Sequence, residues 1–440
     1  MKKTFNEKMR IASMKDKTKE KKTEKLEDPL FFYVSFQQHI GQPAKEIVKP
    51  GDYIKRYQLI GESQGSISAK IHSPVSGIVK EITEKILPNG MKAKTAVIEN
   101  DFQYTEMETV KRDIKKIGEY SAKELLEIIG NAGITGEGGA QFPTHIKYDV
   151  KNKKIKNIIL NGAECEPYLT CDYILMKDYG KELFDGIKII AEILKPENII
   201  LAIDEKYSSL TDKFPEYNTD GVKIVTVSDV YPQGSEQLLI KSIFNKEIPK
   251  SKLPSEEGII VSNVGTVKAV YEAFVNGVPL VERIVTVSGE KSGIYGNYTA
   301  KIGTPLSHII EKSALKDTLE NIRIIFGGPM MGNEVNDPET VIMKGTSGVL
   351  FLSKEIDKIE RKNCILCGYC SEVCPVYLMP MKFEEFYRKK KYKKLAEYNL
   401  SSCIECGACE YVCPSRVALI ESIKSGKKEL SRMKGGGING

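Results

Sequence analysis

The stretch that decides the fold of this chain lies near its C-terminus and occurs twice. It reads Cys364-Ile365-Leu366-Cys367-Gly368-Tyr369-Cys370-Ser371-Glu372-Val373-Cys374-Pro375, and then Cys403-Ile404-Glu405-Cys406-Gly407-Ala408-Cys409-Glu410-Tyr411-Val412-Cys413-Pro414. In this spacing, C-x2-C-x2-C-x3-C-P, three thiolates surround one 4Fe-4S cube and the fourth, before the proline, reaches the neighbouring cube. We therefore predict two 4Fe-4S clusters, one held by Cys364, Cys367, Cys370 and Cys413, the other by Cys403, Cys406, Cys409 and Cys374.

Two other uses of cysteine fit this pattern less well. Structural zinc sites usually join one C-x2-C pair to a distant second pair, rather than four close sulfurs. Disulfides belong to oxidising compartments, whereas matching cysteine repeats without a secretory signal indicate metal ligation. Cys165 and Cys171 lie outside the repeats, and we expect neither to be a ligand.

The composition is that of a globular protein with several domains. The chain has 440 residues, of which 41% are hydrophobic and 28% charged, with a formal net charge of +6. No apolar run approaches the roughly 18 residues of a membrane-spanning helix, and Met1–Arg10 is charged, so we expect a cytoplasmic protein. The positive charge is local, in Lys15–Lys25 and Arg388–Lys394, and does not suit nucleic-acid binding. We expect the first block to be a solvated, disordered arm, since it offers little to bury.

Turn signals and hydrophobic periodicity divide the chain into successive domains of a multidomain α/β and α+β protein. Short β-rich pieces at 29–105 predict a β half-barrel (a barrel-sandwich hybrid) that resembles biotinyl and lipoyl carriers but lacks a convincing carrier lysine. Apolar β-branched runs alternating with helical stretches at 115–278 predict a parallel α/β domain, with strands at Asn157–Leu160, Ile199–Ile203, Val222–Val227 and Ile259–Val261.

The remaining segments are smaller. We predict a β-grasp-like module at 279–335, a linker at 336–361, a two-cluster ferredoxin-like helical domain at 362–425 and a flexible tail at 426–440, with the basic arm at 1–28. Ligands of parallel sheets bind beyond the carboxyl ends of the strands. Three such ends carry polar, turn-prone residues, at 161–166, 231–236 and 263–266.

A glycine-rich loop precedes the first strand of the α/β domain. It reads Gly133-Ile134-Thr135-Gly136-Glu137-Gly138-Gly139-Ala140-Gln141-Phe142-Pro143-Thr144-His145-Ile146-Lys147. Its glycines allow backbone N–H groups to approach a phosphate, and Lys147 adds a mobile positive charge. It is neither a P-loop nor the G-x-G-x-x-G of dinucleotide folds, and by pattern alone a purely structural turn is equally acceptable.

The combination of motifs is more specific than any one of them. The glycine loop, Asn161-Gly162-Ala163-Glu164-Cys165-Glu166-Pro167, Tyr231-Pro232-Gln233-Gly234 and Asn263-Val264-Gly265-Thr266 occur in order. Gln37–Gly41, Gly327–Gly332 and both cysteine repeats complete a pattern over about residues 30 to 425 that resembles the C subunit of the Rnf complex. The central part is also similar to the flavin subunit of respiratory complex I.

This resemblance implies a nucleotide site. Gly136, Gly138, Gly139 and Lys147 would hold the phosphate of a non-covalent FMN, and the flavin would be lined by Asn161, Tyr231, Gly234, Asn263 and Thr266. Glu164 and Glu166 would face the substrate NADH, accept hydrogen bonds from its ribose and repel the extra phosphate of NADPH. Without the resemblance, each glutamate would be read as a solvated residue at a strand end.

Two residues depart from the family pattern. Gln141 stands where we expect glycine, and Glu137 stands where a neutral or basic residue is usual. If position 141 requires positive φ or a close approach to FMN, a side chain there costs about 1 to 3 kcal/mol or blocks the site.

The implied function is that of the peripheral NADH-oxidising subunit of a membrane-bound, ion-translocating NADH:ferredoxin oxidoreductase. It would sit on the cytoplasmic face of the membrane, held by the other subunits, which include a ferredoxin-like iron-sulfur subunit. Two alternatives remain: a soluble flavin and iron-sulfur reductase that serves another acceptor, and a non-catalytic electron relay with a degenerate nucleotide site. The sequence leaves open the pumped ion, the direction of electron flow and the accepting subunit.

Overall fold

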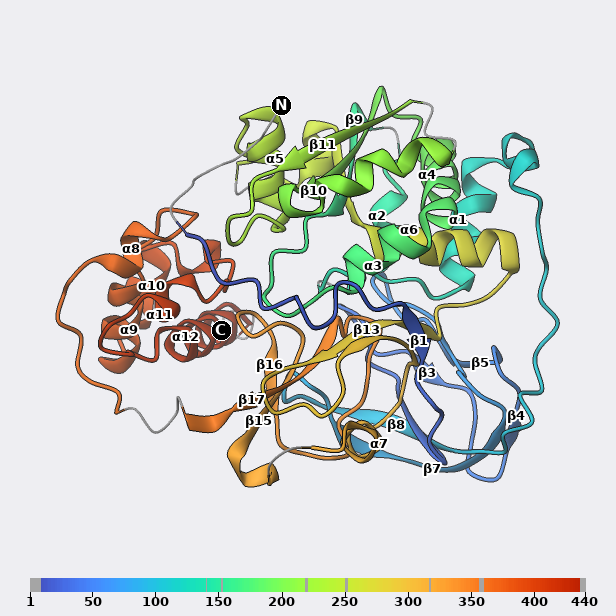
Figure 1. Ribbon diagram of the computed structural model, residues 1–440, viewed down its shortest axis with the longest axis horizontal. Helices are drawn as coiled ribbons and strands as arrows, with labels where there is room; N and C mark the ends of the chain where they lie inside the picture. Colours follow the sequence, from blue (N-terminus) through green and yellow to red (C-terminus); the bar gives the residue numbers. More distant parts are fainter. Residues whose placement is uncertain are drawn as a thin grey trace.

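The computed structural model describes residues 9–139, 141–151, 153–217, 221–249, 252–315, 318–355 and 360–435 (Figure 1). Within these residues, no helix combines the length and the apolar character needed to cross a membrane. Beside the helices named below there are 3-10 helices at Ile114–Glu119, Glu205–Asp212, Phe214–Glu216, Pro254–Glu257, Leu319–Asn321 and Leu400–Ser402, and a π-helical turn at Glu272–Asn276.

The N-terminal domain consists of two small antiparallel sheets packed face to face. One has the order β2 (Phe31–Ser35), β8 (Lys92–Asn100), β7 (Gly77–Ile86), β4 (Tyr53–Ile54), and the other β3 (Lys45–Glu46), β5 (Leu59–Glu62), β6 (Ile71–His72). Because side chains of a strand alternate between its faces, Phe32 and Val34 point into a shared core with Ile60 and Ile98. The short strands between turn signals agree with the predicted half-barrel.

The α/β domain is built on a parallel sheet in the order β11 (Val222–Val227), β10 (Asn198–Asp204), β9 (Asn157–Gly162), β12 (Ile259–Asn263). Successive strand residues enter different cores: Ile158 and Leu160 pack on one face, and Ile159 packs on the other. Strands buried on both faces read as continuous apolar runs, which is why they could be recognised in the sequence. The α-helices of this domain are α1 (Ala122–Asn131), α2 (Thr144–Tyr148), α3 (Cys171–Asp178), α4 (Gly180–Leu194), α5 (Glu236–Phe244) and α6 (Val264–Tyr271).

A mixed sheet follows, and it extends further along the chain than predicted. Its order is β1 (Thr23–Lys25), β14 (Gly296–Lys301), β13 (Glu282–Ser288), β17 (Gly348–Ser353), β15 (Ile322–Phe326), β16 (Asn333–Val335), with α7 (Leu306–Ser313) packed on its core. The predicted end of this module at 335 is wrong, and so is the predicted linker at residues 348–353, because β17 inserts between β13 and β15. Residues 356–359 of that linker lie outside the described part. Val349 and Phe351 are fully buried there, so this segment completes the core.

The C-terminal domain is helical and forms a separate lobe in Figure 1. It contains α8 (Tyr369–Glu372), α9 (Pro380–Arg388), α10 (Tyr392–Glu397), α11 (Ala408–Tyr411) and α12 (Leu419–Gly435). The predicted flexible tail at 426–440 is wrong for residues 426–435, which continue α12, and residues 436–440 lie outside the described part. α12 packs closely here, since a Cβ on Gly426 would lie 2.9 Å from a methyl carbon of Leu400.

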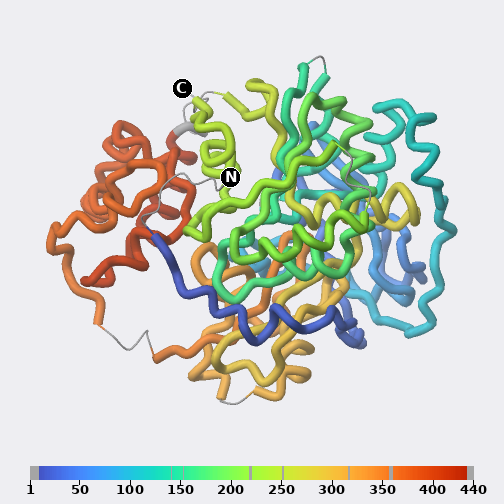
Figure 2. Tube along the Cα trace, turned by 45° about the horizontal axis from the view of Figure 1, so that its top comes forward, coloured from blue at the N-terminus to red at the C-terminus, as the bar shows by residue number. Residues whose placement is uncertain are grey.

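The basic N-terminal arm is ordered from residue 9, contrary to the prediction of a disordered segment. It crosses from the C-terminal lobe, along the α/β domain, to the mixed sheet (Figures 1 and 2). Backbone bonds hold it: Met9 O accepts from Tyr231 N at 3.0 Å, Ser13 O accepts from Tyr168 N at 2.8 Å, and β1 pairs with β14. The prediction failed because these partners come from distant sequence, and residues 1–8 lie outside the described part.

Candidate functional site

A cavity of about 650 Å³ lies where the α/β domain meets the N-terminal domain and the mixed sheet. All the predicted nucleotide-site residues except Tyr231 line it: Gly136, Gly138, Gly139, Lys147, Asn161, Glu164, Glu166, Gly234, Asn263 and Thr266. They meet because the parallel strands β9 and β12 end side by side at the same edge of the sheet.

The glycine loop forms one wall of the cavity. Its backbone closes on itself, since Gly136 N donates to Phe142 O at 2.9 Å and Gln141 N donates to Gly136 O at 3.1 Å. Gly139 has φ +98°, and a Cβ there would meet nothing within 4 Å, so its backbone borders open space. Lys147, on α2, pairs with Glu236 at 3.2 Å.

Gln141 adopts the left-handed conformation that the family resemblance made us expect of a glycine. Its φ is +50°, where a side chain costs about 1 kcal/mol. Its amide lies over Gly345, at which a Cβ would come within 2.1 Å of Nε2. Glu137, the other departure, is buried; burial raises its pKa, and Arg283, 3.8 Å away, opposes that rise.

The strand-end residues form a hydrogen-bonded frame. Asn161 Nδ2 donates to Gly234 O at 2.8 Å, and Asn263 Nδ2 donates to Asp172 Oδ2 at 2.8 Å. Thr266 Oγ1 accepts from Glu137 N at 3.0 Å. These bonds fix the amide and hydroxyl groups at the cavity wall before any ligand enters.

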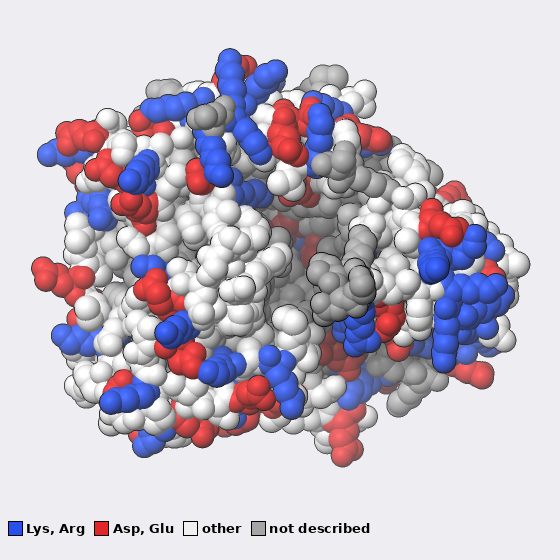
Figure 3. Space-filling view, turned by 180° about the vertical axis from the view of Figure 1, so that it is seen from behind, with Lys and Arg blue, Asp and Glu red and all other residues white. Residues whose placement is uncertain are grey.

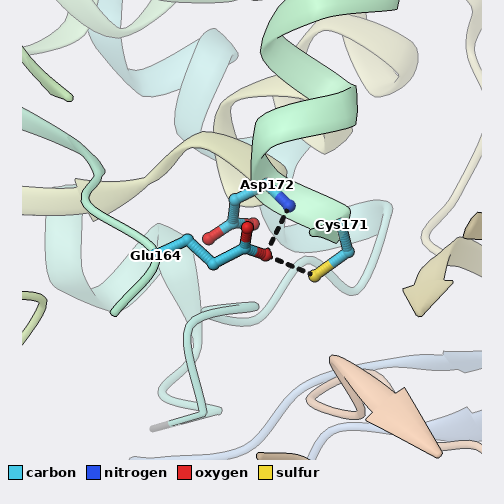
Figure 4. Close-up of side chains that lie close together, drawn as sticks. All are labelled: Glu164, Cys171 and Asp172. Carbon is cyan, nitrogen blue, oxygen red and sulfur yellow. Dashed lines mark hydrogen bonds between the residues drawn. The ribbon is translucent and has the colours of Figure 1, made fainter. Parts of the chain in front are cut away.

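Glu164 reaches toward the start of α3, where Cys171 and Asp172 lie (Figure 4). Its Oε1 accepts from Asp172 N at 3.0 Å and from Cys171 Sγ at 3.3 Å. Its Oε2 is buried without a hydrogen-bond donor in the described part of the chain. Burial raises the pKa of Asp172, and the charge of Glu164 adds to that rise.

Glu166 and Tyr231 connect the cavity to the C-terminal lobe. The Tyr231 hydroxyl donates to Cys406 O at 2.6 Å and lies 3.2 Å from Glu166 Oε1, while Glu166 Oε2 accepts from Met330 N at 3.0 Å. Burial raises the pKa of Glu166 to about 7, against the hydrogen bonds that favour its charged form. Tyr231 therefore lies between the cavity and the cysteine domain, whereas the resemblance implied a place against the flavin.

The cysteines line two small cavities in the crossed arrangement that the spacing predicts. One is lined by Cys364, Cys367, Cys370 and Cys413, and the other by Cys374, Cys403, Cys406 and Cys409. Equivalent hydrogen bonds from backbone to sulfur occur in the two repeats. Leu366 N and Glu405 N each donate to the sulfur of the first cysteine of their repeat at 3.4 Å. Sets of four thiols around one space, with N–H donors to sulfur, suit 4Fe-4S clusters.

The larger cavity also suits the cofactor that the sequence suggested. Its volume is within the range of cofactor pockets, its wall combines apolar surface with fixed amides, and open space borders Gly139. Glu164 Oε2 accepts no hydrogen bond from the described residues, so it can accept one from a ligand donor.

Sequence reasoning missed several residues of this site. Gln37, His39 and Asn89 of the N-terminal domain line the cavity, Asp172 fixes Asn263, and Lys15 of the arm contacts Glu164. The Gln37–Gly41 motif marks the family but carries no predicted role in the site. Nothing local to Lys15 or Asn89 distinguishes them from other surface residues, because their place depends on contacts between domains.

Comparison with known proteins agrees with this arrangement. Residues 3–103 match the RnfC barrel sandwich hybrid domain, residues 129–272 match the Nuo51 FMN-binding domain, and residues 363–417 match a 4Fe-4S dicluster domain. These three matches confirm the barrel-sandwich, FMN-type α/β and 4Fe-4S parts of the predicted multidomain fold.

Curated relatives cover most of the chain. The C subunit of the proton-translocating ferredoxin:NAD(+) oxidoreductase complex of Clostridium ljungdahlii is 37% identical, over 84% of this chain and 81% of the relative. The C subunit of the Na(+)-translocating complex of Acetobacterium woodii is 35% identical, over 91% of both chains. The C subunit of the ion-translocating oxidoreductase complex of Rhodobacter capsulatus is 37% identical, over 94% of this chain and 80% of the relative.

Among solved structures, a chain of an NAD+-reducing [NiFe]-hydrogenase in the H2-reduced state is similar in fold. The match has a TM-score of 0.50 and 17% identity, and covers 74% of this chain and 66% of that chain. At this level of identity the likeness concerns the fold alone.

Proposed function

Because this chain belongs to the family of C subunits of ion-translocating ferredoxin:NAD⁺ oxidoreductase (Rnf) complexes, we propose that it is the subunit at which NADH is oxidised. The observation that carries this proposal is the single cavity that collects the predicted nucleotide residues beside the cysteine domain. We also propose that the mixed sheet is a β-grasp-like module.

The residues present would hold FMN without a covalent bond. The loop amides at Gly136, Gly138 and Gly139, together with Lys147, would bind its phosphate, and the Lys147–Glu236 pair would open to allow this. Asn161, Gly234, Asn263 and Thr266 would line the ring. When bound, FMN supplies the conversion of a hydride, which carries two electrons, into the single electrons that an iron-sulfur cluster accepts.

Glu164 and Glu166 would act on the nicotinamide nucleotide. A carboxylate accepts hydrogen bonds from ribose hydroxyls, and it repels the additional phosphate of NADPH. Both side chains lie at the cavity wall next to the carboxyl end of β9, so both are placed to contact the nucleotide.

The cysteine sites would hold two 4Fe-4S clusters in a fixed order. The site of Cys374, Cys403, Cys406 and Cys409 lies on the cavity side, because Tyr231 donates to the carbonyl of Cys406. The other site lies nearer the surface, where Cys364 and Cys367 are exposed. Electrons would therefore leave from the Cys364 site to a partner, which we propose is a ferredoxin-like iron-sulfur subunit of the complex at the cytoplasmic face of the membrane.

Anaerobic purification with cofactor analysis tests this function. We expect about eight iron and eight sulfide per chain, and roughly one FMN that is released intact on denaturation. NADH should bleach the flavin absorbance faster than NADPH, and Glu166→Lys should reduce that preference.

Two outcomes would favour the alternatives. A protein with intact clusters that binds neither FMN nor NADH would be a non-catalytic relay. A protein that oxidises NADH but reduces a soluble acceptor without any of the other subunits would be a free-standing reductase.

A further inference from the structure

Residues 13–18 of the N-terminal arm are hydrogen-bonded to the loop that carries both candidate glutamates. This loop, 164–170, connects β9 to α3. Ser13 O accepts from Tyr168 N at 2.8 Å, and the Thr18 hydroxyl accepts from Thr170 Oγ1 at 2.9 Å.

Lys15 makes the third and most direct contact. Its Nζ donates to Glu164 O at 2.6 Å and lies 3.5 Å from Glu164 Oε2, which accepts no hydrogen bond from the described residues. Only 2% of the Lys15 side chain is exposed. Burial lowers the pKa of Lys15, and Glu164 is the largest influence that opposes this shift.

A lysine is rarely buried this deeply unless its charge is paired. Taking a charged side chain out of water is expensive, and the cost is recovered only with a paired charge and satisfied donors. Lys15 has a paired charge in the Glu164 carboxylate, and it donates to the backbone carbonyl of the same residue. The arm supplies this lysine from 149 residues away in the sequence.

We propose that Lys15 is a positioning residue of the nucleotide site, which holds Glu164 in place at the cavity wall. The inference rests on the proposed function, in which Glu164 faces the nicotinamide nucleotide. Lys15 itself does not line the cavity, so it acts through Glu164. The N-terminal arm is thereby part of the site and not merely a cover over the α/β domain.

Binding of NAD⁺ to the protein loaded with FMN and iron-sulfur clusters, measured by calorimetry, tests the inference without turnover. Lys15→Met keeps the length of the side chain but loses its donors. It should weaken NAD⁺ binding by about 10- to 100-fold, because a hydrogen bond to a charged group is worth about 1.5 to 3 kcal/mol. Lys17→Met is the matched control, since Lys17 is exposed and its Nζ bonds to Tyr295 rather than to Glu164; it should leave binding unchanged.

A double-mutant cycle separates positioning from general stability. If Lys15 acts through Glu164, Lys15→Met should cause little further loss in a Glu164→Gln background. An equal loss in both backgrounds, or unchanged binding in Lys15→Met, overturns the inference while the proposed function stands. Wild-type protein that binds no NAD⁺ overturns both.

A second variant covers the case in which Lys15→Met loses its cofactors. Thr18→Val preserves shape and removes the bond to Thr170, so it should weaken NAD⁺ binding by about fivefold, the value of one neutral hydrogen bond. Thr18→Val with wild-type affinity would then count against a role of the arm in the site.

Discussion

At the residue scale, two positions carry conformations or charges that need tertiary support. Gln141 holds a left-handed backbone, with its side chain over Gly345, and Glu166 holds a buried carboxyl between Tyr231 and Met330. Both line the same cavity. Strain and buried charge are common where a protein binds a ligand, since the surrounding structure must hold groups that would otherwise relax.

Replacing Gln141 tests whether its side chain limits cofactor binding. Gln141→Gly should raise FMN affinity by about fivefold, because glycine adopts positive φ without the cost of about 1 kcal/mol that other residues meet. Gln141→Ala is the control: it shortens the side chain but keeps the strain. Equal gains in both variants would assign the effect to side-chain bulk, and no gain in either would show that the loop tolerates Gln141. Equilibrium fluorescence titration of FMN provides the measurement.

Replacing Glu166 tests its buried protonation. The carboxyl has a pKa of about 7 in the folded protein and about 4.5 when unfolded, so between these values the folded state binds more protons. Its contribution to stability is therefore present at low pH and is lost as the pH rises toward 7 and above. The Glu166→Gln variant has no carboxyl to ionise at this position, so it does not lose stability in this way. Its free energy of unfolding relative to wild type should therefore rise by about 2 kcal/mol between pH 5 and pH 8.

Thermal unfolding at several pH values provides the comparison. Glu311→Gln, on the exposed surface of α7, serves as the control substitution. A Glu166→Gln difference that is the same at pH 5 and pH 8 would contradict the buried, protonated carboxyl.

At the scale of elements, the two cysteine repeats exchange their last ligand. Each repeat places a short helix, α8 or α11, after its second cysteine, and each last cysteine lies in the wall of the other repeat's cavity. The exchange ties the halves of the domain together, so neither half completes its own site. A sequence repeat is therefore not a structural unit here.

Removing one exchanged cysteine tests this arrangement. Cys413→Ala should damage the cluster of Cys364, Cys367 and Cys370, although residue 413 belongs to the second repeat. Cys409→Ala is the matched comparison and should affect the other cluster, because residue 409 stays with its own repeat. Iron content and the electron paramagnetic resonance spectra of the reduced proteins distinguish the two. Loss of the same cluster in both variants would contradict the exchange.

At the scale of the whole molecule, the cysteine lobe has a strongly basic surface. Lysine and arginine gather on this lobe in Figure 3. The exposed residues of the basic block are Arg388, Lys389, Lys390, Lys391, Lys393 and Lys394. Glu384, Glu385 and Glu397 pair with part of this block, which leaves positive charge available to a partner.

Changing Lys389, Lys390, Lys391, Lys393 and Lys394 together to glutamine should weaken attachment to membranes that hold the other subunits. Attachment through exposed charge is screened by salt, so the wild-type protein should also be released as ionic strength rises. Lys115→Gln with Lys116→Gln, at exposed positions of the α/β domain, is the control. Sedimentation of membranes with bound protein measures the effect. Unchanged retention would make the block a solvated helix surface.

Features that depend on neighbouring residues could be read from the sequence. The cysteine spacing predicted the crossed sets of four cysteines, because a few residues between ligands limit where each sulfur can lie. The apolar runs predicted the four parallel strands, since strands buried on both faces cannot be polar on either. The order of motifs indicated the family and the residues that meet in the cavity.

Features that depend on distant partners were decided only by the tertiary structure. The sequence predicted a linker at residues 348–353, but in the structure these residues form a strand between β13 and β15. It predicted that Lys15 is solvated, but Lys15 is buried against the loop at 164–170. The place of Tyr231 also depends on a distant partner, because its hydroxyl donates to the carbonyl of Cys406, 175 residues away. In each case, the burial of the residue depends on which domains pack together. That packing cannot be predicted from the neighbouring residues in the sequence.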